Sequence, residues 1–180
     1  MLIDSSSCTL LVVDVQEKLF NKIYNSKSIY KHLLNTVYIF SQLNLPIVYT
    51  EQYPKGLGST IKNLKQKLDE IDSKKFEKTS FSCFPSNKSV DNWISTKQVL
   101  ICGIETHICI LQTALDLKKY GYEVFIMNEG VGSRTLENKM LAVNRLKLNN
   151  IAILSFEMLV FELLRDSNHK HFRDFSILVK

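Results

Sequence analysis

Short apolar runs alternate with segments of helical periodicity along most of this chain. The first run, residues 8–14, is apolar apart from Thr9 until it ends at the carboxylate of Asp14. Such an uninterrupted run is typical of a strand that is buried on both faces. The next segment, residues 29–43, carries apolar residues at helical spacing, and Pro46 cannot continue that helix. The pattern thus predicts a buried strand, a helix and then a second strand.

The same pattern continues to the end of the chain. Further strands are expected at residues 47–50, 74–78, 99–102, 123–127 and 151–154. Residues 51–59 are expected to form a loop. Further helices are expected at residues 90–95, 111–120, 135–148, 158–164 and 171–178.

Regular alternation of strands and helices predicts a parallel sheet. Right-handed crossovers place helices on both faces of such a sheet. The 180 residues fit one domain with a substantial core, and the sequence contains no repeat, low-complexity tract or linker. We therefore expect a single three-layer, Rossmann-like α/β domain over residues 1–180.

Composition excludes several classes of protein. No segment approaches the roughly 20 apolar residues of a membrane span, and residues 1–7 lack the features of an export signal. The four cysteines form no C-x-x-C pair and no zinc spacing, so a reduced, cytoplasmic protein is expected. Net charge is +5, but the lysines are dispersed and no nucleic-acid module is present. Neither a membrane nor a nucleic acid is the expected partner.

Chemically useful side chains follow the strands. In an open parallel sheet, ligands bind at the carboxyl ends of the strands near the switch in strand order. Asp14 ends the first expected strand, Glu51 follows the second, Lys78 ends the third, and residues 103–109 follow the fourth. An acid, a lysine and the thiol of Cys109 are therefore expected at one rim of the sheet.

Cys109 is the candidate nucleophile. After a glycine turn at Gly103, it falls in the first turn of the next helix, where N–H groups are unpaired and the dipole favours negative charge. Both effects favour a reactive thiolate, so we expect a lowered pKa for Cys109. The alternative is a small buried core cysteine, which is the role expected of Cys102. Cys83 lies in the loop after Lys78 and is a weaker candidate for the nucleophile.

Five segments of the chain resemble one family in order and in register. They are residues 13–18, 50–58, 78–82, 102–110 and 132–134. Together they resemble the isochorismatase-like cysteine hydrolases, most closely the isochorismatase-domain-containing subgroup that lacks a metal site. With the alternating pattern, this resemblance implies a six-stranded parallel sheet in the order 3-2-1-4-5-6.

The resemblance also implies a catalytic triad of Asp14, Lys78 and Cys109. Cys109 would attack an amide or similar carbonyl carbon and form a thioester-type intermediate. Asp14 would take the thiol proton and pass it to the leaving nitrogen, while Lys78 would stabilise the charged states.

The resemblance alone also implies a special backbone geometry and a set of substrate-binding residues. It implies a cis peptide bond between Ile104 and Glu105 that directs the N–H groups of Glu105 and Cys109 at a developing oxyanion. Candidate substrate-binding residues at the pocket or its rim are Gln16, Glu51, Tyr53 and Arg134.

Two departures from the wider family limit the chemistry. Metal-dependent nicotinamidases carry an Asp-x-His pair after the second strand, where this chain has Glu51-Gln52-Tyr53. No metal is therefore expected, and no organic cofactor, because a G-x-G-x-x-G loop is also missing. Isochorismatases that cleave a vinyl ether lack the cysteine that is present here as Cys109. Glu129 stands where relatives often have Asp, and its role stays open.

The expected function is hydrolysis of a small amide, ureide or related carbonyl compound at a C–N bond other than a peptide bond. The rival interpretation is an interaction module of the same fold whose chemistry has lapsed, with weak nucleic-acid affinity from its positive charge. A homo-oligomer is expected from the resemblance. The same expectation follows from apolar residues near the C-terminus, namely Phe156, Leu159, Phe161 and Leu163.

Overall fold

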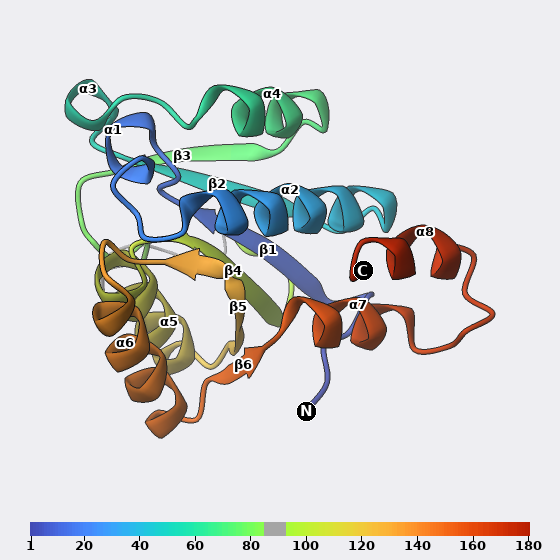
Figure 1. Ribbon diagram of the computed structural model, residues 1–180. Helices are drawn as coiled ribbons and strands as arrows, with labels where there is room; N and C mark the ends of the chain where they lie inside the picture. Colours follow the sequence, from blue (N-terminus) through green and yellow to red (C-terminus); the bar gives the residue numbers. More distant parts are fainter. Residues whose placement is uncertain (85–92) are drawn as a thin grey trace.

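A computed structural model describes residues 1–84 and 93–180 (Figure 1). Six strands form one parallel sheet in the order β3-β2-β1-β4-β5-β6. The predicted fold class and strand order are therefore confirmed. The strands are β1 (Cys8–Val13), β2 (Ile47–Gln52), β3 (Lys74–Lys78), β4 (Gln98–Ile104), β5 (Glu123–Gly132) and β6 (Ala152–Leu154).

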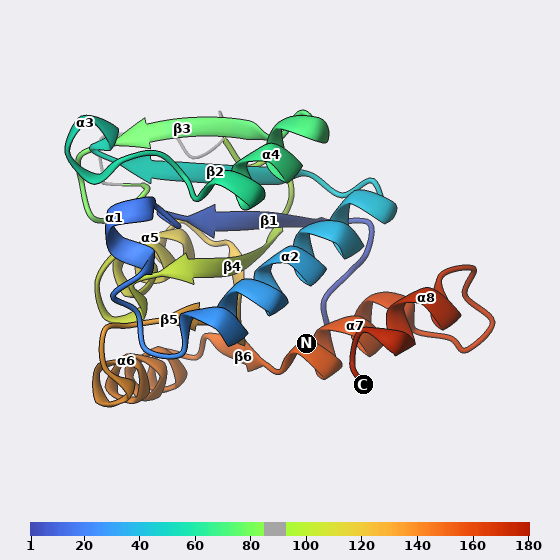
Figure 2. The same ribbon diagram turned by 45° about the horizontal axis from the view of Figure 1, so that its top comes forward.

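Helices cover both faces of the sheet, as Figures 1 and 2 show. One face carries α2 (Ser26–Gln42), α4 (Lys62–Glu70), α7 (Phe156–Leu164) and α8 (Phe172–Ile177). The other carries the π-helix η1 (Thr106–Ile110), which leads into α5 (Leu111–Lys119), and α6 (Leu136–Leu148). The short helices α1 (Glu17–Phe20) and α3 (Pro54–Leu57) lie in the connections. Across the described ranges, no helix has the length and apolar character that crossing a membrane requires.

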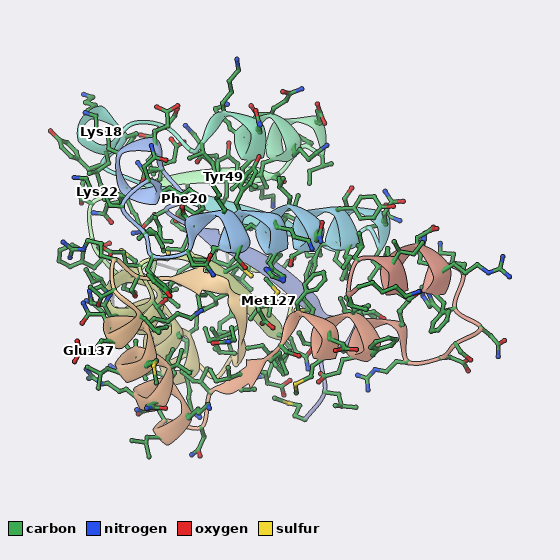
Figure 3. The ribbon with its side chains drawn as sticks, in the orientation of Figure 1. Lys18, Phe20, Lys22, Tyr49, Met127 and Glu137 are labelled. Atoms are coloured by element: carbon green, nitrogen blue, oxygen red, sulfur yellow. The ribbon has the colours of Figure 1, made fainter. Side chains whose placement is uncertain are left out.

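Side-chain alternation along β1 divides the core into two clusters. Leu10 and Val12 pack on the α2 side, whereas Leu11 and Val13 pack on the α5 side, and all four are buried. Successive residues of a strand point to opposite faces, so a strand with no polar face must be covered twice. On the α2 side, Met127 accepts a hydrogen bond at its sulfur from a buried threonine of α2 at 3.3 Å (Figure 3).

Several elements differ from the sequence prediction. Residues 90–92 of the expected helix 90–95 lie outside the described residues, and residues 93–95 are not helical. Helix α4 was not predicted, because its lysines obscure the two leucines, Leu64 and Leu68, that it buries. The expected loop 51–59 contains the end of β2 and the short helix α3. Strand β5 continues five residues beyond the predicted end at Met127, reaching Gly132.

Gly103 lies inside β4 and not in a turn after it, because the strand continues to Ile104. Its φ is +119°, and a Cβ added there would lie 2.1 Å from the carbonyl oxygen of Val13. Only glycine permits this approach of β4 to the end of β1. This contact fixes how close the end of β1, which Asp14 follows, lies to the end of β4, which leads to Cys109.

The apolar residues near the C-terminus are mostly used within the chain. Phe156, Leu159 and Leu163 are buried, and only Phe161 is exposed. The sequence argument for a surplus apolar surface there was therefore wrong, because α7 packs into the core. Exposed apolar side chains gather on α6 instead, at Leu136, Met140, Leu141 and Leu148.

The homo-oligomer stays a prediction, now tied to α6. Exposed apolar groups on one helix favour association. Sedimentation velocity at micromolar concentration should give a mass above the 20.8 kDa of one chain. Met140→Glu with Leu141→Glu should lower that mass, whereas Phe161→Glu should leave it unchanged. A monomer in the unsubstituted protein would contradict the prediction.

Gly103→Ala should destabilise the protein strongly. Its Cβ would overlap backbone atoms of β1 that cannot move without breaking the sheet, so a loss above about 3 kcal/mol is expected from urea unfolding. Gly121 provides a matched control, since its φ is +84° but nothing lies within 4 Å of an added Cβ. Gly121→Ala should cost only the conformational strain of about 1–2 kcal/mol. Equal losses of stability in the two variants would show that the close contact with Val13 does not cause the loss in Gly103→Ala.

Candidate active site

A buried ion pair joins the ends of β1 and β3. Asp14 directly follows β1, and Lys78 is the last residue of β3. Lys78 Nζ lies 2.6 Å from Asp14 Oδ2, and the two side chains are 0% and 1% exposed. Two of the three residues expected to form a triad are therefore in direct contact. They reach each other across β2, which lies between their strands in the sheet.

Oxygen atoms surround the Lys78 ammonium. Besides Asp14, it donates to Gln52 Oε1 at 2.6 Å and to the backbone carbonyls of Ser80 and Phe81 at 3.2 and 3.1 Å. Burial alone would lower the pKa of Lys78, but the charges of neighbouring groups, Asp14 among them, outweigh it and raise that pKa. Lys78 therefore stays charged although its side chain is buried.

Both oxygens of Asp14 accept hydrogen bonds. Lys78 bonds to Oδ2, and the hydroxyl of Thr50 donates to Oδ1 at 2.7 Å. Thr50 is 1% exposed and belongs to β2. A carboxylate offers about four acceptor positions, so Asp14 retains capacity for a third donor.

Cys109 lies beside this ion pair. It lies within η1 and is 8% exposed, and the charges of both Asp14 and Lys78 act on its thiol. Burial raises the pKa of Cys109, Asp14 raises it further, and Lys78 lowers it, with a net rise. The expected lowering of this pKa was wrong, because burial and the carboxylate outweigh the helix N-terminus and the lysine. The sulfur therefore rests as a thiol beside a carboxylate that can accept its proton.

Cys83 borders this cluster from the interior. It is fully buried, and burial raises its pKa to about 11. Its sulfur lies 4.0 Å from Thr50 Oγ1, and its backbone N–H donates to Thr113 Oγ1 at 3.0 Å. Thr113 lies one turn beyond Cys109 in the continuous η1–α5 segment. Cys102 is buried in the cluster on the opposite side of the sheet, which confirms its expected core role.

Gln16 and Glu51, expected to line the pocket, have structural partners instead. Gln16 is fully buried: its Nε2 donates to the carbonyls of Gln52 and Gly58 at 3.0 and 2.6 Å, and its Oε1 accepts from Gln52 N at 2.7 Å. Glu51 Oε1 accepts from the N–H and hydroxyl of Thr60 at 2.7 and 2.9 Å. The placement of Glu51 beside the triad was wrong because its side chain leaves β2 on the face opposite to Thr50 and Gln52.

Tyr53 and Arg134 are exposed. Tyr53 is 55% exposed, and its ring covers Gly56, where an added Cβ would lie 2.3 Å from Tyr53 Cε1. The Arg134 side chain is 57% exposed, and both its Nε and its backbone N–H donate to Glu105 Oε2 at 3.1 Å. Arg134 is thus held beside the segment that leads to Cys109.

The structure also places two other features that the sequence analysis named, the Ile104–Glu105 peptide bond and Glu129. The peptide bond between Ile104 and Glu105 is cis, directly before η1. Glu129 Oε2 accepts a hydrogen bond from the backbone N–H of Phe156 at 3.1 Å. Since Phe156 begins α7, Glu129 caps a helix and takes no part in the cluster around Asp14.

Sequence reasoning missed Thr50 and Gln52, which contact Asp14 and Lys78. Neither residue is charged, so neither stood out among candidate catalytic groups. The available signal was the alternation of β2, which places residues 50 and 52 on one face. Over residues 1–84 and 93–180, no group of three or more His, Cys, Asp or Glu side chains is arranged to hold a metal ion.

Comparison with known proteins identifies the family. The isochorismatase domain matches residues 8–158. Isochorismatase family protein 1B of Dictyostelium discoideum is 34% identical over 175 residues, covering 95% of this chain and 85% of that protein. Isochorismatase domain-containing protein 2 of Bos taurus is also 34% identical, covering 97% of this chain and 83% of that protein.

A solved structure agrees with these relatives. The Caenorhabditis elegans protein named MAR1 ribonuclease superposes with a TM-score of 0.89 at 30% identity, covering 99% of this chain and 92% of that chain. The domain match covers most of the chain and includes Asp14, Lys78 and Cys109. This chain therefore belongs to the isochorismatase domain family, the family that its five sequence segments resemble.

Proposed function

We propose that this protein is a cysteine hydrolase that cleaves a small amide, ureide or related carbonyl compound. The observation that supports it most is the position of Asp14, which is paired with Lys78 at 2.6 Å and whose charge acts on the thiol of Cys109. A nucleophile, a base and a group that fixes the base are the parts that covalent catalysis requires. Membership of the isochorismatase family supports the hydrolase class.

The first half-reaction forms a thioester. Cys109 sulfur attacks the carbonyl carbon as its proton moves to Asp14, which gives a tetrahedral intermediate with a negative oxygen. Asp14 then donates the proton to the leaving nitrogen, the C–N bond breaks, and the acyl group stays on Cys109. Lys78 stays charged throughout and compensates the negative charge as it moves between carboxylate and sulfur.

The second half-reaction restores the enzyme. A water molecule enters after the amine leaves, and Asp14 takes a proton from it as its oxygen attacks the thioester carbon. Collapse of this second intermediate breaks the C–S bond and releases the acid. The sulfur then recovers its proton from Asp14, so the cycle consumes one water molecule and yields one acid and one amine.

The oxyanion would be stabilised by backbone N–H groups at the beginning of η1. The first N–H groups of a helix lack partners within it, and here they lie on the same segment as the attacking sulfur. We assign this role to the N–H groups of Glu105 and Cys109. A single well-placed donor of this kind is worth about 3 kcal/mol in the transition state.

The substrate should be small, with a polar or anionic group that faces the rim. Cys109 is only 8% exposed, which restricts the reacting carbonyl to a compact group. Arg134, held through its Nε to Glu105, retains its terminal nitrogens as donors for such a substrate group. Tyr53 is the other exposed rim candidate, although its ring is engaged with Gly56.

The rival proposal is an interaction module, or a protein that acts on nucleic acid. The name of the C. elegans relative, MAR1 ribonuclease, and the net charge of +5 favour an RNA test. A buried nucleophile favours a small carbonyl substrate over a polymer. RNA cleavage that persists in Cys109→Ala would support action on nucleic acid, and RNA binding without cleavage would support the interaction module. RNA that stays intact and unbound would count against both.

Cys109→Ala and Asp14→Asn should each lower turnover about 10³-fold or more on any substrate found in a panel of small amides and ureides. Combining them should add little, because residues that act as one unit are not additive. Cys83→Ala is the control for the choice of nucleophile and should retain turnover within about tenfold. Activity that persists in Cys109→Ala but is lost in Cys83→Ala would refute the mechanism.

Asp14→Asn should separate thiolate formation from catalysis. Because the Asp14 charge raises the pKa of Cys109, its removal should let the thiolate form at lower pH. The midpoint of Cys109 alkylation by iodoacetamide, followed by mass spectrometry, should move down by about one pH unit or more. Hydrolysis should nevertheless be lost, since the base is gone. An unchanged or higher midpoint would contradict a role for Asp14 beside the thiol.

A further inference from the structure

Two alternate residues of β2 face the ion pair. Thr50 contacts Asp14, and Gln52 contacts Lys78, whereas Glu51 between them points to the other side and bonds Thr60. Thr50 and Gln52 are 1% and 9% exposed. The central strand between Asp14 and Lys78 therefore carries one polar group for each member of the pair.

The hydroxyl of Thr50 has a fixed direction. A carboxylate can only accept, so the hydroxyl hydrogen points to Asp14 Oδ1 at 2.7 Å. Its oxygen is then free to accept from the thiol of Cys83 at 4.0 Å. Cys83 keeps its proton at neutral pH because burial raises its pKa to about 11. A directed chain thus runs from Cys83 through Thr50 to Asp14.

The amide of Gln52 is fixed in the same way. Its Nε2 donates to the carbonyl of Thr79 at 2.6 Å, and its Oε1 accepts from Lys78 at 2.6 Å. Its backbone N–H is held by Gln16 Oε1 at 2.7 Å. With both ends of the amide engaged, the oxygen cannot turn away from the ammonium.

We propose that Thr50 and Gln52 are positioning residues of the triad, an inference that rests on the proposed hydrolase function. Thr50 stabilises Asp14 as a carboxylate and stops it from rotating, so that an acceptor position stays directed at Cys109. Gln52 holds the Lys78 ammonium against Asp14 Oδ2. Neither touches substrate, and each acts through the charged residue that it contacts.

The proposal makes Thr50 a determinant of the pH range of activity. A donor to a carboxylate favours its charged form. Without that donor, the charged arrangement of the site that can accept the thiol proton is less favoured, and most so in acid. Loss of the hydroxyl should therefore remove activity from the acidic side of the profile while substrate binding is retained.

The test compares Thr50→Val, which keeps shape but loses the hydroxyl, with Thr50→Ser, which keeps the hydroxyl. Thr50→Val should move the acidic limb of kcat/KM up by about one pH unit and lower kcat at neutral pH about tenfold, with KM within about twofold. Thr50→Ser should restore both values. Gln52→Leu should lower kcat with little change in KM and without moving the acidic limb.

Thr60→Val is the matched control. Thr60 is also 1% exposed and also donates its hydroxyl to a buried carboxylate, Glu51, at 2.9 Å, but on the other face of β2. Thr60→Val should destabilise the protein about as much as Thr50→Val does, but it should leave the pH profile of activity unchanged. If both valine variants move the limb equally, or neither does, Thr50 is only structural and the inference is wrong.

Alkylation of Cys109 separates failure of this inference from failure of the proposed function. In Thr50→Val the alkylation midpoint should move to higher pH, because the Asp14 charge near the sulfur loses a compensating dipole, and in Thr50→Ser it should not. This shift without hydrolysis of any panel compound would support the role of Thr50 and refute the hydrolase. Hydrolysis with identical midpoints and pH profiles in both variants would refute the role of Thr50 alone.

Discussion

The buried ion pair between Lys78 and Asp14 is the interaction on which the site depends. Removing two charges from water is costly, and the pair is tolerated only if its remaining donors and acceptors are satisfied. Here, a side chain from β2 and two carbonyls after β3 complete the shell around Lys78. The ends of three strands must therefore keep their register, or a buried charge loses its partners.

This arrangement also explains why a raised thiol pKa is compatible with a nucleophilic Cys109. In the resting site, Lys78 and Asp14 cancel, and Cys109 is neutral. Loss of the thiol proton to solvent would leave a net negative charge in a buried site, which is unfavourable. Transfer of the same proton to Asp14 leaves a thiolate beside an ammonium and keeps the site neutral. The structure thus favours proton transfer within the triad over a permanent thiolate.

The sheet could be predicted well from the sequence because each strand is marked by a local run of apolar residues. Apolar runs locate the strands, and the rule for parallel sheets brings Asp14 and Lys78 to one edge. Helix α4 was missed because only Leu64 and Leu68 mark its buried face among charged residues. The pKa of Cys109 was predicted in the wrong direction because its burial depends on packing by distant segments, which no local pattern records.

The neighbours of the ion pair were harder to predict for a different reason. Charge drew attention to Glu51, yet side-chain direction in a strand, and not charge, decides which residues of β2 reach Asp14. Thr50 and Gln52 lie on one face, and Glu51 bonds Thr60 on the other. A strand end with satisfied polar groups on both faces can neither shift by one residue nor rotate without leaving a charge unpaired. The polar end of β2 therefore fixes register for the fold and geometry for the triad through the same hydrogen bonds.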